Sequence, residues 1–540
     1  MLAELESVIF ELVRKTSNIL ISIVLGLVLL GGCTLCQLKD LPDPIKVPVL
    51  VETEEPKEDF FPLGWYSSLE PEELKEIADL GGNFVITYVL SGREDHKIKP
   101  FLDEAEKLGI QVLLDVTADW MWLDDDMPQP SHSIGDWRWS FEYAYSKRAS
   151  HHGAFRKNAQ NDHGFRFAEG GYPVMNIQPH DIIENWIYIP SDSNISELMI
   201  EFWAAKLTGG FSWKYRVYWG EDKCQRYFDG EKLPKVRAGD IPKERDQWVK
   251  LAFDVDLIGL DQTVVHGINF VNYGSQVYWD KLTRRTGKKR LEERVAEFWD
   301  HPALYGWYLC DEPEMRNITP ERMKEIYDIV RAADPDPNNI LAPVYQDWKV
   351  VEPFSNSSDE IFIDCYPVET DRQVLDWMTK WVSEAQRVAT KQGKKFYFIP
   401  QAFGDISAYP YWTKPNEHQF RWMTWTPIIM GARGICYWAY YVAPDYLIKQ
   451  SKELFAEIRS YMDYFQFGNV VTGLSCNITE DSDGDGNPNL LYSAIDYDGK
   501  RLLMISNGIS KNQKVKITGS EFKFESEIGP HEIIIKELEL

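Results

Sequence analysis

Two adjacent acidic residues stand where an apolar run meets a proline, and they could perform acid–base chemistry. Asp311 and Glu312 follow the run Leu304–Cys310 and precede Pro313. A carboxyl group keeps its proton near neutral pH when it is desolvated or lies beside another negative charge. Glu312 could therefore donate a proton to a leaving oxygen, with Asp311 raising its pKa. The alternative is that these residues only cap the helix that follows.

A proton donor of this kind usually works with a second carboxylate, which attacks the substrate or activates water. Asp364, at the end of another short apolar run, is the preferred second carboxylate, and Asp347 and Asp115 are the next choices. Such a set of acids would suit the cleavage of a glycosidic bond.

The elements that must position these acids follow from short apolar runs that alternate with helical patterns, which is typical of a parallel sheet with crossover helices. The pattern predicts an α/β fold, a (β/α)8 TIM barrel built from residues 60–135 and 282–467. A doubly wound open sheet is the alternative, but no Gly-rich phosphate loop follows the first strand. The predicted strands are 61–65, 83–90, 111–116, 304–310, 339–344, 360–364, 395–400 and 434–440.

In such a barrel the carboxyl ends of the strands carry the chemistry. We expect the catalytic residues Glu312, Asp364 and Asp311 to meet there. The residues predicted to contact a substrate from the same ends are Trp65, Asp115, Asp347, Tyr366, Gln401, Trp438 and Tyr440.

The segment His301–Glu314 resembles the fourth-strand signature of clan A glycoside hydrolases, with Asp311 in place of the usual Asn. The resemblance implies a barrel fold, O-glycosyl hydrolase activity on an oligo- or polysaccharide, and Glu312 as the general acid/base.

The same resemblance implies that Tyr366 lies near the reacting sugar and that Trp438 forms an aromatic platform. The clan's second Glu, its nucleophile, is replaced here by Gln401. A standard retaining double displacement is therefore not expected. An inverting mechanism follows if Glu312 and Asp364 stand far enough apart to admit a water molecule.

Two further regions read as β-structure, because short apolar runs alternate with turn residues. The pattern of residues 136–281 predicts an inserted β-sandwich, and this region resembles jelly-roll carbohydrate-binding modules. Its candidate aromatic residues, which either bind sugar or form the sandwich core, are Trp203, Trp213 and Trp219. Residues 468–540 predict a small C-terminal β-sandwich with a hairpin at Asp498-Gly499. The acidic stretch that contains Asp481, Asp483 and Asp485 has the spacing of a calcium loop, but Tyr492 stands where the closing Glu is expected.

The N-terminus reads as a targeting segment. The apolar run Ile19–Leu30 follows Arg14-Lys15 and is too short to span a bilayer as a helix. It ends in Leu30-Gly-Gly-Cys33, which resembles a lipoprotein signal and implies lipidation of Cys33. The alternative is a single uncleaved span. Either reading predicts a membrane anchor at residues 1–36, a linker at 37–59 and an extracytoplasmic location at the cell surface.

The formal net charge of −26 excludes nucleic acid as a favoured partner, because a polyanion would be repelled. It does not exclude neutral sugars. No cysteine spacing indicates a zinc site, so no cofactor is required beyond the possible structural calcium. The expected function is an extracytoplasmic glycoside hydrolase. The alternatives are a non-catalytic carbohydrate-binding surface lipoprotein and a barrel used only as a scaffold.

Overall fold

The computed structural model describes residues 60–87, 95–117, 120–122, 131–146, 148–167, 175–206, 209–370, 375–406, 411–478, 487–520 and 522–540. The predicted anchor and linker at residues 1–59, with Cys33, lie outside the described residues, as do Asp481, Asp483 and Asp485. Within the described ranges, no helix combines the length and the apolar character needed to cross a membrane.

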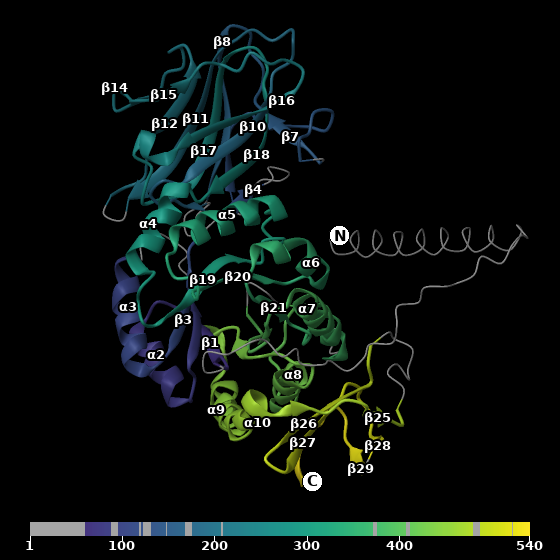
Figure 1. Cartoon of the computed structure of the whole chain (residues 1–540). Helices are drawn as coiled ribbons and strands as arrows, with labels where there is room; N and C mark the ends of the chain where they lie inside the picture. The colour runs from purple at the N-terminus through teal and green to yellow at the C-terminus, as the bar shows by residue number, and fades with distance from the viewer. Residues whose placement is uncertain are drawn as a thin grey trace, which may run out of the picture. The chain divides into compact units, whose positions relative to one another are not determined.

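Eight parallel strands form a closed barrel (Figure 1). The first strand closes the ring, because Trp65 is in register with Val85 of the second strand and with Tyr437 of the eighth. The strands coincide closely with the predicted runs, so the (β/α)8 prediction is confirmed. In ring order they are β1 (Leu63–Ser67), β2 (Phe84–Thr87), β3 (Gln111–Asp115), β19 (Leu304–Asp311), β20 (Ile340–Tyr345), β21 (Ile361–Cys365), β22 (Phe396–Pro400) and β23 (Ile435–Tyr437).

Amphipathic helices cover the strands. In α5, for example, the Thr319 side chain accepts a hydrogen bond from the Arg322 N–H as the N-cap, and Met323, Ile326 and Val330 form the buried face. The helices are α2 (Pro71–Asp79), α3 (Asp95–Leu108), α4 (Lys288–Phe298), α5 (Pro320–Ala333), α6 (Val351–Phe354), α7 (Thr379–Gln392), α8 (Glu417–Ile429), α9 (Asp445–Ser460) and α10 (Met462–Phe467), with 3-10 turns η2 (Val255–Ile258), η3 (Trp348–Val350), η4 (Ser355–Ser357), η5 (Leu375–Met378) and η6 (Tyr440–Val442).

Side chains alternate along each barrel strand, so neighbouring residues serve different layers. Tyr66, Phe84 and Tyr308 belong to the cluster that fills the barrel interior. Trp65, one residue before Tyr66, belongs instead to the cluster shared with the helices, together with Leu74 of α2.

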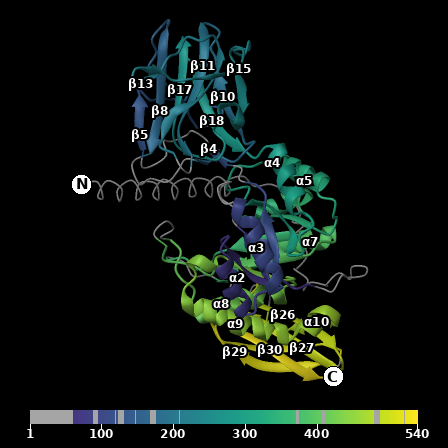
Figure 2. The ribbon, with the colours of Figure 1, turned by 90° about the vertical axis from the view of Figure 1, so that its left-hand side faces the viewer.

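Between β3 and α4 the chain forms two large, mainly antiparallel sheets (Figures 1 and 2), and strands β13 and β14 form a separate two-stranded sheet. Buried residues of both sheets, such as Ile183 and Leu198, form one hydrophobic cluster. The first sheet has the order β16-β10-β18-β7-β6, with β4 paired to β18, and the second has the order β15-β12-β11-β17-β8-β5, with β9 paired to β17. The strands are β4 (Trp120–Trp122), β5 (Ser131–Gly135), β6 (Arg138–Ser140), β7 (Ser150–His152), β8 (Ala159–Phe167), β9 (Met175–Asn176), β10 (Ile182–Tyr188), β11 (Ile195–Lys206), β12 (Ser212–Gly220), β13 (Tyr227–Phe228), β14 (Glu231–Lys232), β15 (Val236–Gly239), β16 (Trp248–Asp254), β17 (Thr263–Gly274) and β18 (Tyr278–Arg285).

These sheets begin before residue 136, the predicted start of the insertion, because β4 and β5 already pair within them. The sequence from Ser131 to Gly135 is polar and Gly-terminated, so its strand character comes from pairing with β8 rather than from its own pattern.

The C-terminal residues form a four-stranded sheet, β24-β26-β27-β30, and a three-stranded sheet, β25-β28-β29. Asp498 and Gly499 both have positive φ at the β26–β27 turn, as predicted for that hairpin. Trp422 of α8 donates a hydrogen bond to the Asn507 carbonyl (2.9 Å), which ties β27 to the barrel helices. The strands are β24 (Asn469–Val470), β25 (Ser475–Cys476), β26 (Leu490–Tyr497), β27 (Lys500–Asn507), β28 (Gln513–Thr518), β29 (Lys523–Ile528) and β30 (Ile533–Glu539).

Candidate active site

The two adjacent acids lie where β19 ends in an irregular turn. The register of β19 with β20 shifts between Tyr308 and Asp311, and Glu312 has φ of 43°, in the left-handed region. The Glu312 N–H still donates to the Val344 carbonyl (3.0 Å). A non-glycine residue in this region is uncommon and a bulge redirects side chains. Strand alternation therefore no longer separates the two acids.

Asp311 is held in a hydrogen-bonded chain that crosses the barrel. Its carboxylate accepts from the Tyr308 hydroxyl (2.5 Å) and from the Arg316 guanidinium (2.8 Å). The Tyr66 hydroxyl lies 3.2 Å from that of Tyr308. Burial raises the pKa of Asp311, and the ion pair with Arg316 opposes that increase. Asp311 thus acts as a fixed negative neighbour of Glu312 rather than as a free acid.

Glu312 and Asp364 form a hydrogen-bonded pair of carboxyl groups. The Asp364 side chain is almost fully buried at 2% exposure, and its Oδ2 accepts from the Tyr366 hydroxyl (2.6 Å). Its Oδ1 has no other donor in the described part of the chain. Two ionised carboxylates could not share such a contact, so the pair retains a proton.

The pKa of Glu312 is raised to about 7, first by desolvation and next by the charge of Asp311, while the hydrogen bond with Asp364 opposes the increase. Burial and then the charge of Glu312 raise the pKa of Asp364 well above its usual value. The predicted meeting of Glu312, Asp311 and Asp364 at the strand ends is therefore found. Glu312 and Asp364 do not stand far enough apart to admit a water molecule, because their side chains are hydrogen-bonded.

Aromatic rings surround the acid pair. The ring of Tyr366 lies 5.9 Å from that of Trp438 and 5.6 Å from that of Trp412, and Phe403 packs at 4.5 Å from Trp438. Trp438 and Trp412 are half-buried, whereas Phe403 is fully buried. Tyr366 and Trp438 thus lie together at the carboxyl ends of β21 and β23, and their roles toward a sugar stay predictions. The Trp438–Ala439 peptide bond is cis.

Other predicted substrate contacts have structural roles. Trp65 is fully buried between β1 and the helices, so it cannot meet a substrate. The Tyr440 hydroxyl donates to Glu76 of α2, and Asp347 caps η3 by accepting from the Lys349 N–H (3.0 Å). The sequence pattern locates the ends of the strands. It does not show whether a side chain there points into the barrel or caps a neighbouring helix.

Asp115 is buried at the end of β3, where its carboxylate accepts from the Thr117 N–H (3.2 Å). Its charge reaches the Tyr308 hydroxyl, whose pKa it helps to raise. Asp115 therefore adds to the negative field of the site without joining the Glu312–Asp364 pair.

Gln401, which stands at the end of β22, is fully buried and already hydrogen-bonded. Its amide group donates to the carbonyls of Val368, Phe403 and Thr413 (3.1 Å each), and its carbonyl accepts from the Val368 N–H (2.9 Å). Gln401 thus joins two loops at the carboxyl end of the barrel and offers no free group to a substrate.

Replacing Gln401 by Leu should lower the free energy of unfolding by about 2–4 kcal/mol, because several buried backbone groups would lose their partners at once. Thermal unfolding of the variant and the parent measures the change. A variant with unaltered stability and a raised KM for a substrate would instead place Gln401 in a binding site.

Several residues of the site carry no sequence motif. Tyr66 and Tyr308 could be found from strand alternation once the register is known, and Trp412 only from the tertiary structure. The Glu314 carboxylate accepts from the N–H groups of Gln346 (2.6 Å) and Asp347 (2.8 Å), so it fixes the loop after β20. Burial raises the pKa of Glu314.

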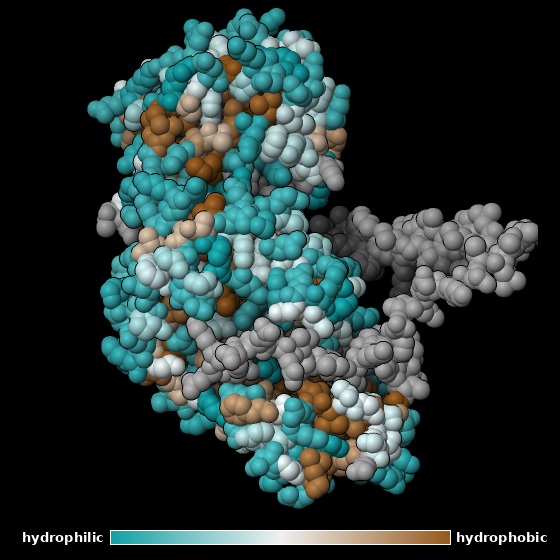
Figure 3. Space-filling view, viewed as in Figure 1, coloured by the Kyte–Doolittle hydropathy of each residue, from teal (hydrophilic) through white to brown (hydrophobic). Residues whose placement is uncertain are grey.

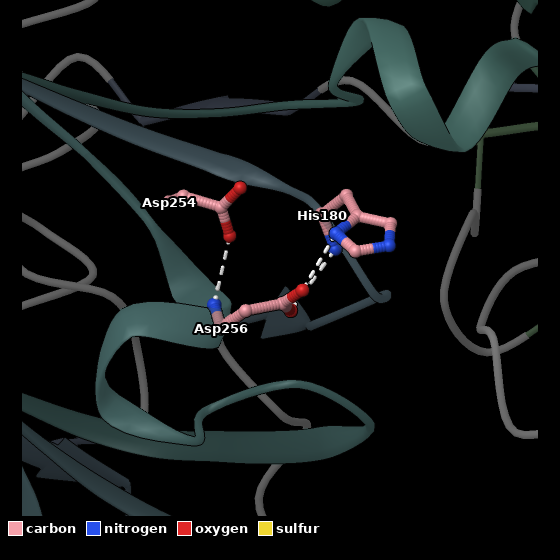
Figure 4. A group of neighbouring side chains, drawn as sticks. All are labelled: His180, Asp254 and Asp256. Atoms are coloured by element: carbon pink, nitrogen blue, oxygen red, sulfur yellow. Dashed lines mark hydrogen bonds and ion pairs between the residues drawn. The ribbon is translucent and has the colours of Figure 1, made fainter.

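Among the described residues, one group has the geometry to hold a metal ion, and it belongs to the inserted sheets rather than to the acid pair. It consists of His180, Asp254 and Asp256 (Figure 4). His180 Nδ1 lies 2.5 Å from Asp256 Oδ2, and Asp254 accepts from the Asp256 N–H (2.8 Å) as the cap of η2. These contacts account for the cluster as a His–Asp contact beside a helix cap.

No protein-family model and no curated protein matches the sequence. Among solved structures, Amy13B of Eubacterium rectale is similar with a TM-score of 0.41 at 10% identity, over 89% of this chain and 95% of the other. An α-amylase of Geobacillus thermoleovorans gives 0.40 at 10% identity, over 89% and 94%. An Anoxybacillus α-amylase gives 0.31 at 11% identity, over 47% of this chain and 62% of the other. Only the chain's own residues can therefore indicate its function.

Proposed function

We propose that this protein is a glycoside hydrolase that cleaves O-glycosidic bonds of an oligo- or polysaccharide. The observation that carries the proposal is the placement of Glu312 and Asp364 side by side at the carboxyl ends of β19 and β21, where burial and their mutual charge raise the pKa of both carboxyl groups. A carboxyl group with a pKa near 7 is suited to donate a proton at neutral pH. Trp438 supplies partly exposed aromatic surface beside it, on which a sugar ring could stack, and the buried Tyr366 ring packs 5.9 Å from it.

In this mechanism Glu312 acts as the general acid that protonates the leaving oxygen. Asp364, oriented by the Tyr366 hydroxyl, acts as the second carboxylate. Carboxyl groups stand about 5–5.5 Å apart in retaining enzymes and about 6.5–9.5 Å apart in inverting ones. Since the two groups touch in the free protein, a bound sugar must separate them. Glu312, on its irregular turn, is the side chain with room to move, because Asp364 is fully enclosed.

Incubation of the protein with a panel of polysaccharides and aryl glycosides tests the proposal. We expect new reducing ends from at least one substrate, and proton NMR of the first product would distinguish retention from inversion. Binding of a glycan without any release of reducing ends would remove the catalytic proposal.

That outcome would favour a second candidate, a carbohydrate-binding surface protein without catalysis. Two features favour this candidate. Gln401 is neutral and buried at the position where a nucleophile is needed, and the Glu312 and Asp364 carboxyl groups contact each other.

The inserted sheets are proposed to form a carbohydrate-binding module. Trp203, Phe211 and Trp213 cluster on the outer side of the second sheet, with ring centroids 5.4–5.9 Å apart. The guanidinium groups of Arg166 and Arg226 lie over Trp203 and Trp213. Trp219, the third predicted aromatic, is buried in the core of the sheets. The face of the molecule seen in Figure 3 is mostly hydrophilic, with hydrophobic residues in scattered patches.

Replacing Trp203 and Trp213 together by Ala should weaken binding of the protein to its polysaccharide about thirtyfold, since each stacked ring contributes roughly 1 kcal/mol. Affinity gel electrophoresis in the presence of the polysaccharide measures the change. Phe467→Ala, at a ring that is 64% exposed outside the sheets, is the control. Equal retardation of all three proteins would reject this face as the binding surface.

The domain order and location are proposed on the sequence alone. We propose a membrane anchor at residues 1–36 with lipidation at Cys33, which places the barrel outside the cytoplasm. The acidic stretch with Asp481, Asp483 and Asp485 is proposed as a structural calcium loop. A Cys33→Ala variant that stays in the membrane fraction would contradict lipid anchoring.

A further inference from the structure

A groove lies between the first inserted sheet and the start of α5. It holds about 300 Å³, and its walls come from β10, β16 and β18 on one side and from residues 317–325 on the other. The ion pair of Arg285 with Glu325 (2.6 Å) joins the two walls. The second wall belongs to the loop that also carries Arg316, the partner of Asp311. A space of this size accommodates a sugar unit.

One wall of the groove presents a rigid aromatic surface. The Trp186 ring is stacked with that of Tyr145 at 4.1 Å and 15°. The backbone of Tyr145 is held in place, because the buried Asp280 carboxylate accepts hydrogen bonds from the N–H groups of Tyr145 (2.7 Å) and Ser146 (2.9 Å). The aromatic pair is therefore preorganised before any ligand arrives.

Lys281 stands beside this wall in an unusual backbone conformation. It lies where the register between β10 and β18 shifts, and its φ is 52°. A bulge of this kind redirects a side chain. The Lys281 ammonium lies 5.2 Å from the centre of the Tyr145 ring and makes no ion pair within the described ranges. Burial lowers the pKa of Lys281, and the nearby Glu184 opposes that decrease.

The carboxylates of the groove are already engaged. Glu184 pairs with Lys250 (2.7 Å) and with Arg285 (3.1 Å). Glu325 pairs with Arg285 and with Arg322 (3.0 Å). Glu321 interacts with Thr319 and with its own backbone N–H at the start of α5. Among the residues that the structure describes, Lys281 thus has no paired carboxylate, although the chain has a net charge of −26.

We propose that this groove binds an anionic sugar unit, whose carboxylate or sulfate pairs with Lys281 while its ring stacks on Trp186. The proposed binding site is inferred from the groove alone. It rests on the proposed function only in the assumption that the ligand is part of a glycan. If that function is correct, the substrate is an acidic polysaccharide.

Affinity gel electrophoresis with polygalacturonate, alginate and glucuronoxylan, each beside its carboxyl-reduced neutral form, tests the proposal in the full chain carrying Glu312→Gln, so that turnover does not interfere. We expect at least one acidic glycan to bind more than tenfold tighter than its neutral form. Lys281→Met should abolish that preference and Lys281→Arg should keep it, whereas Trp186→Ala should weaken binding of the acidic and the neutral form alike. Lys289→Met, which removes an equal charge from an exposed position outside the groove, should change nothing.

Failure of every acidic glycan to bind more tightly than its reduced form would overturn the proposal. So would a preference that Lys281→Met leaves intact, or that Lys289→Met removes equally. None of these results depends on whether the parent chain hydrolyses a glycan, so the groove and the acid pair are judged separately.

Discussion

Glu312→Gln should lower the turnover of a hydrolysed glycan by about 10²–10⁴-fold, because the amide cannot donate the proton that the leaving oxygen requires. The substitution keeps the size of the side chain and removes only its acidity. Affinity for the same glycan should remain, since the aromatic surface of Trp438 is unchanged. Initial rates of reducing-end release and equilibrium binding of both proteins check the two parts of this expectation.

A matched control is Glu352→Gln, at an exposed residue of α6 that pairs with Arg387 and Lys391. Its turnover should equal that of the parent. Full activity in Glu312→Gln would reject Glu312 as the general acid. An aryl glycoside with an acidic leaving group offers a second check, because such a substrate needs less proton donation and should lose less rate.

The same Glu312→Gln variant should gain stability over the parent as the pH rises from 5 to 8. Glu312 has a pKa of about 7 in the folded protein, compared with 4.5 as its ordinary value. Between these values the folded state holds a proton that the unfolded state has released, so rising pH destabilises the parent. The expected relative gain is on the order of 2–3 kcal/mol at pH 8.

Thermal unfolding of both proteins at pH 5 and pH 8 measures this gain as a difference between two shifts in Tm. Glu352→Gln is again the comparison. Lys391 and Arg387 lower the pKa of Glu352 from its ordinary value of 4.5, so this carboxylate is ionised in the folded and unfolded states across the range, and the Tm difference between Glu352→Gln and the parent should be nearly the same at pH 5 and pH 8. Equal shifts in Tm at both pH values would show that the Glu312 carboxyl group is not held protonated by the fold.

The barrel strands could be predicted from sequence because each is a short apolar run between turn signals, and burial on both faces of a parallel sheet enforces that pattern. Glu312 could be singled out because it follows such a run directly. Which face each residue serves could not be predicted. Trp65 and Tyr66 are neighbours of similar character, and only the register of β1 sends the second into the barrel.

The contact between Glu312 and Asp364 also could not be predicted from the sequence. Asp364 lies on a regular strand, but the turn at Glu312 depends on the shifted register of β19 against β20. The buried, loop-joining position of Gln401 could not be predicted for a related reason, because its partners Val368 and Thr413 come from distant loops. The groove around Lys281 likewise arises from a bulge that no local pattern announces.

The pairing of β4 with β18 has a consequence for how the chain folds. These strands enter and leave the inserted sheets and are joined in register at Met121 and Thr283, so that unit brings its own two ends together. Barrel strands β3 and β19 hydrogen-bond to each other across the entire insertion. If the insertion folds first, the entropy of closing that long loop has already been lost before the two strands meet. The insertion would then act as a clamp that speeds ring closure, and destabilising it should slow refolding of the barrel.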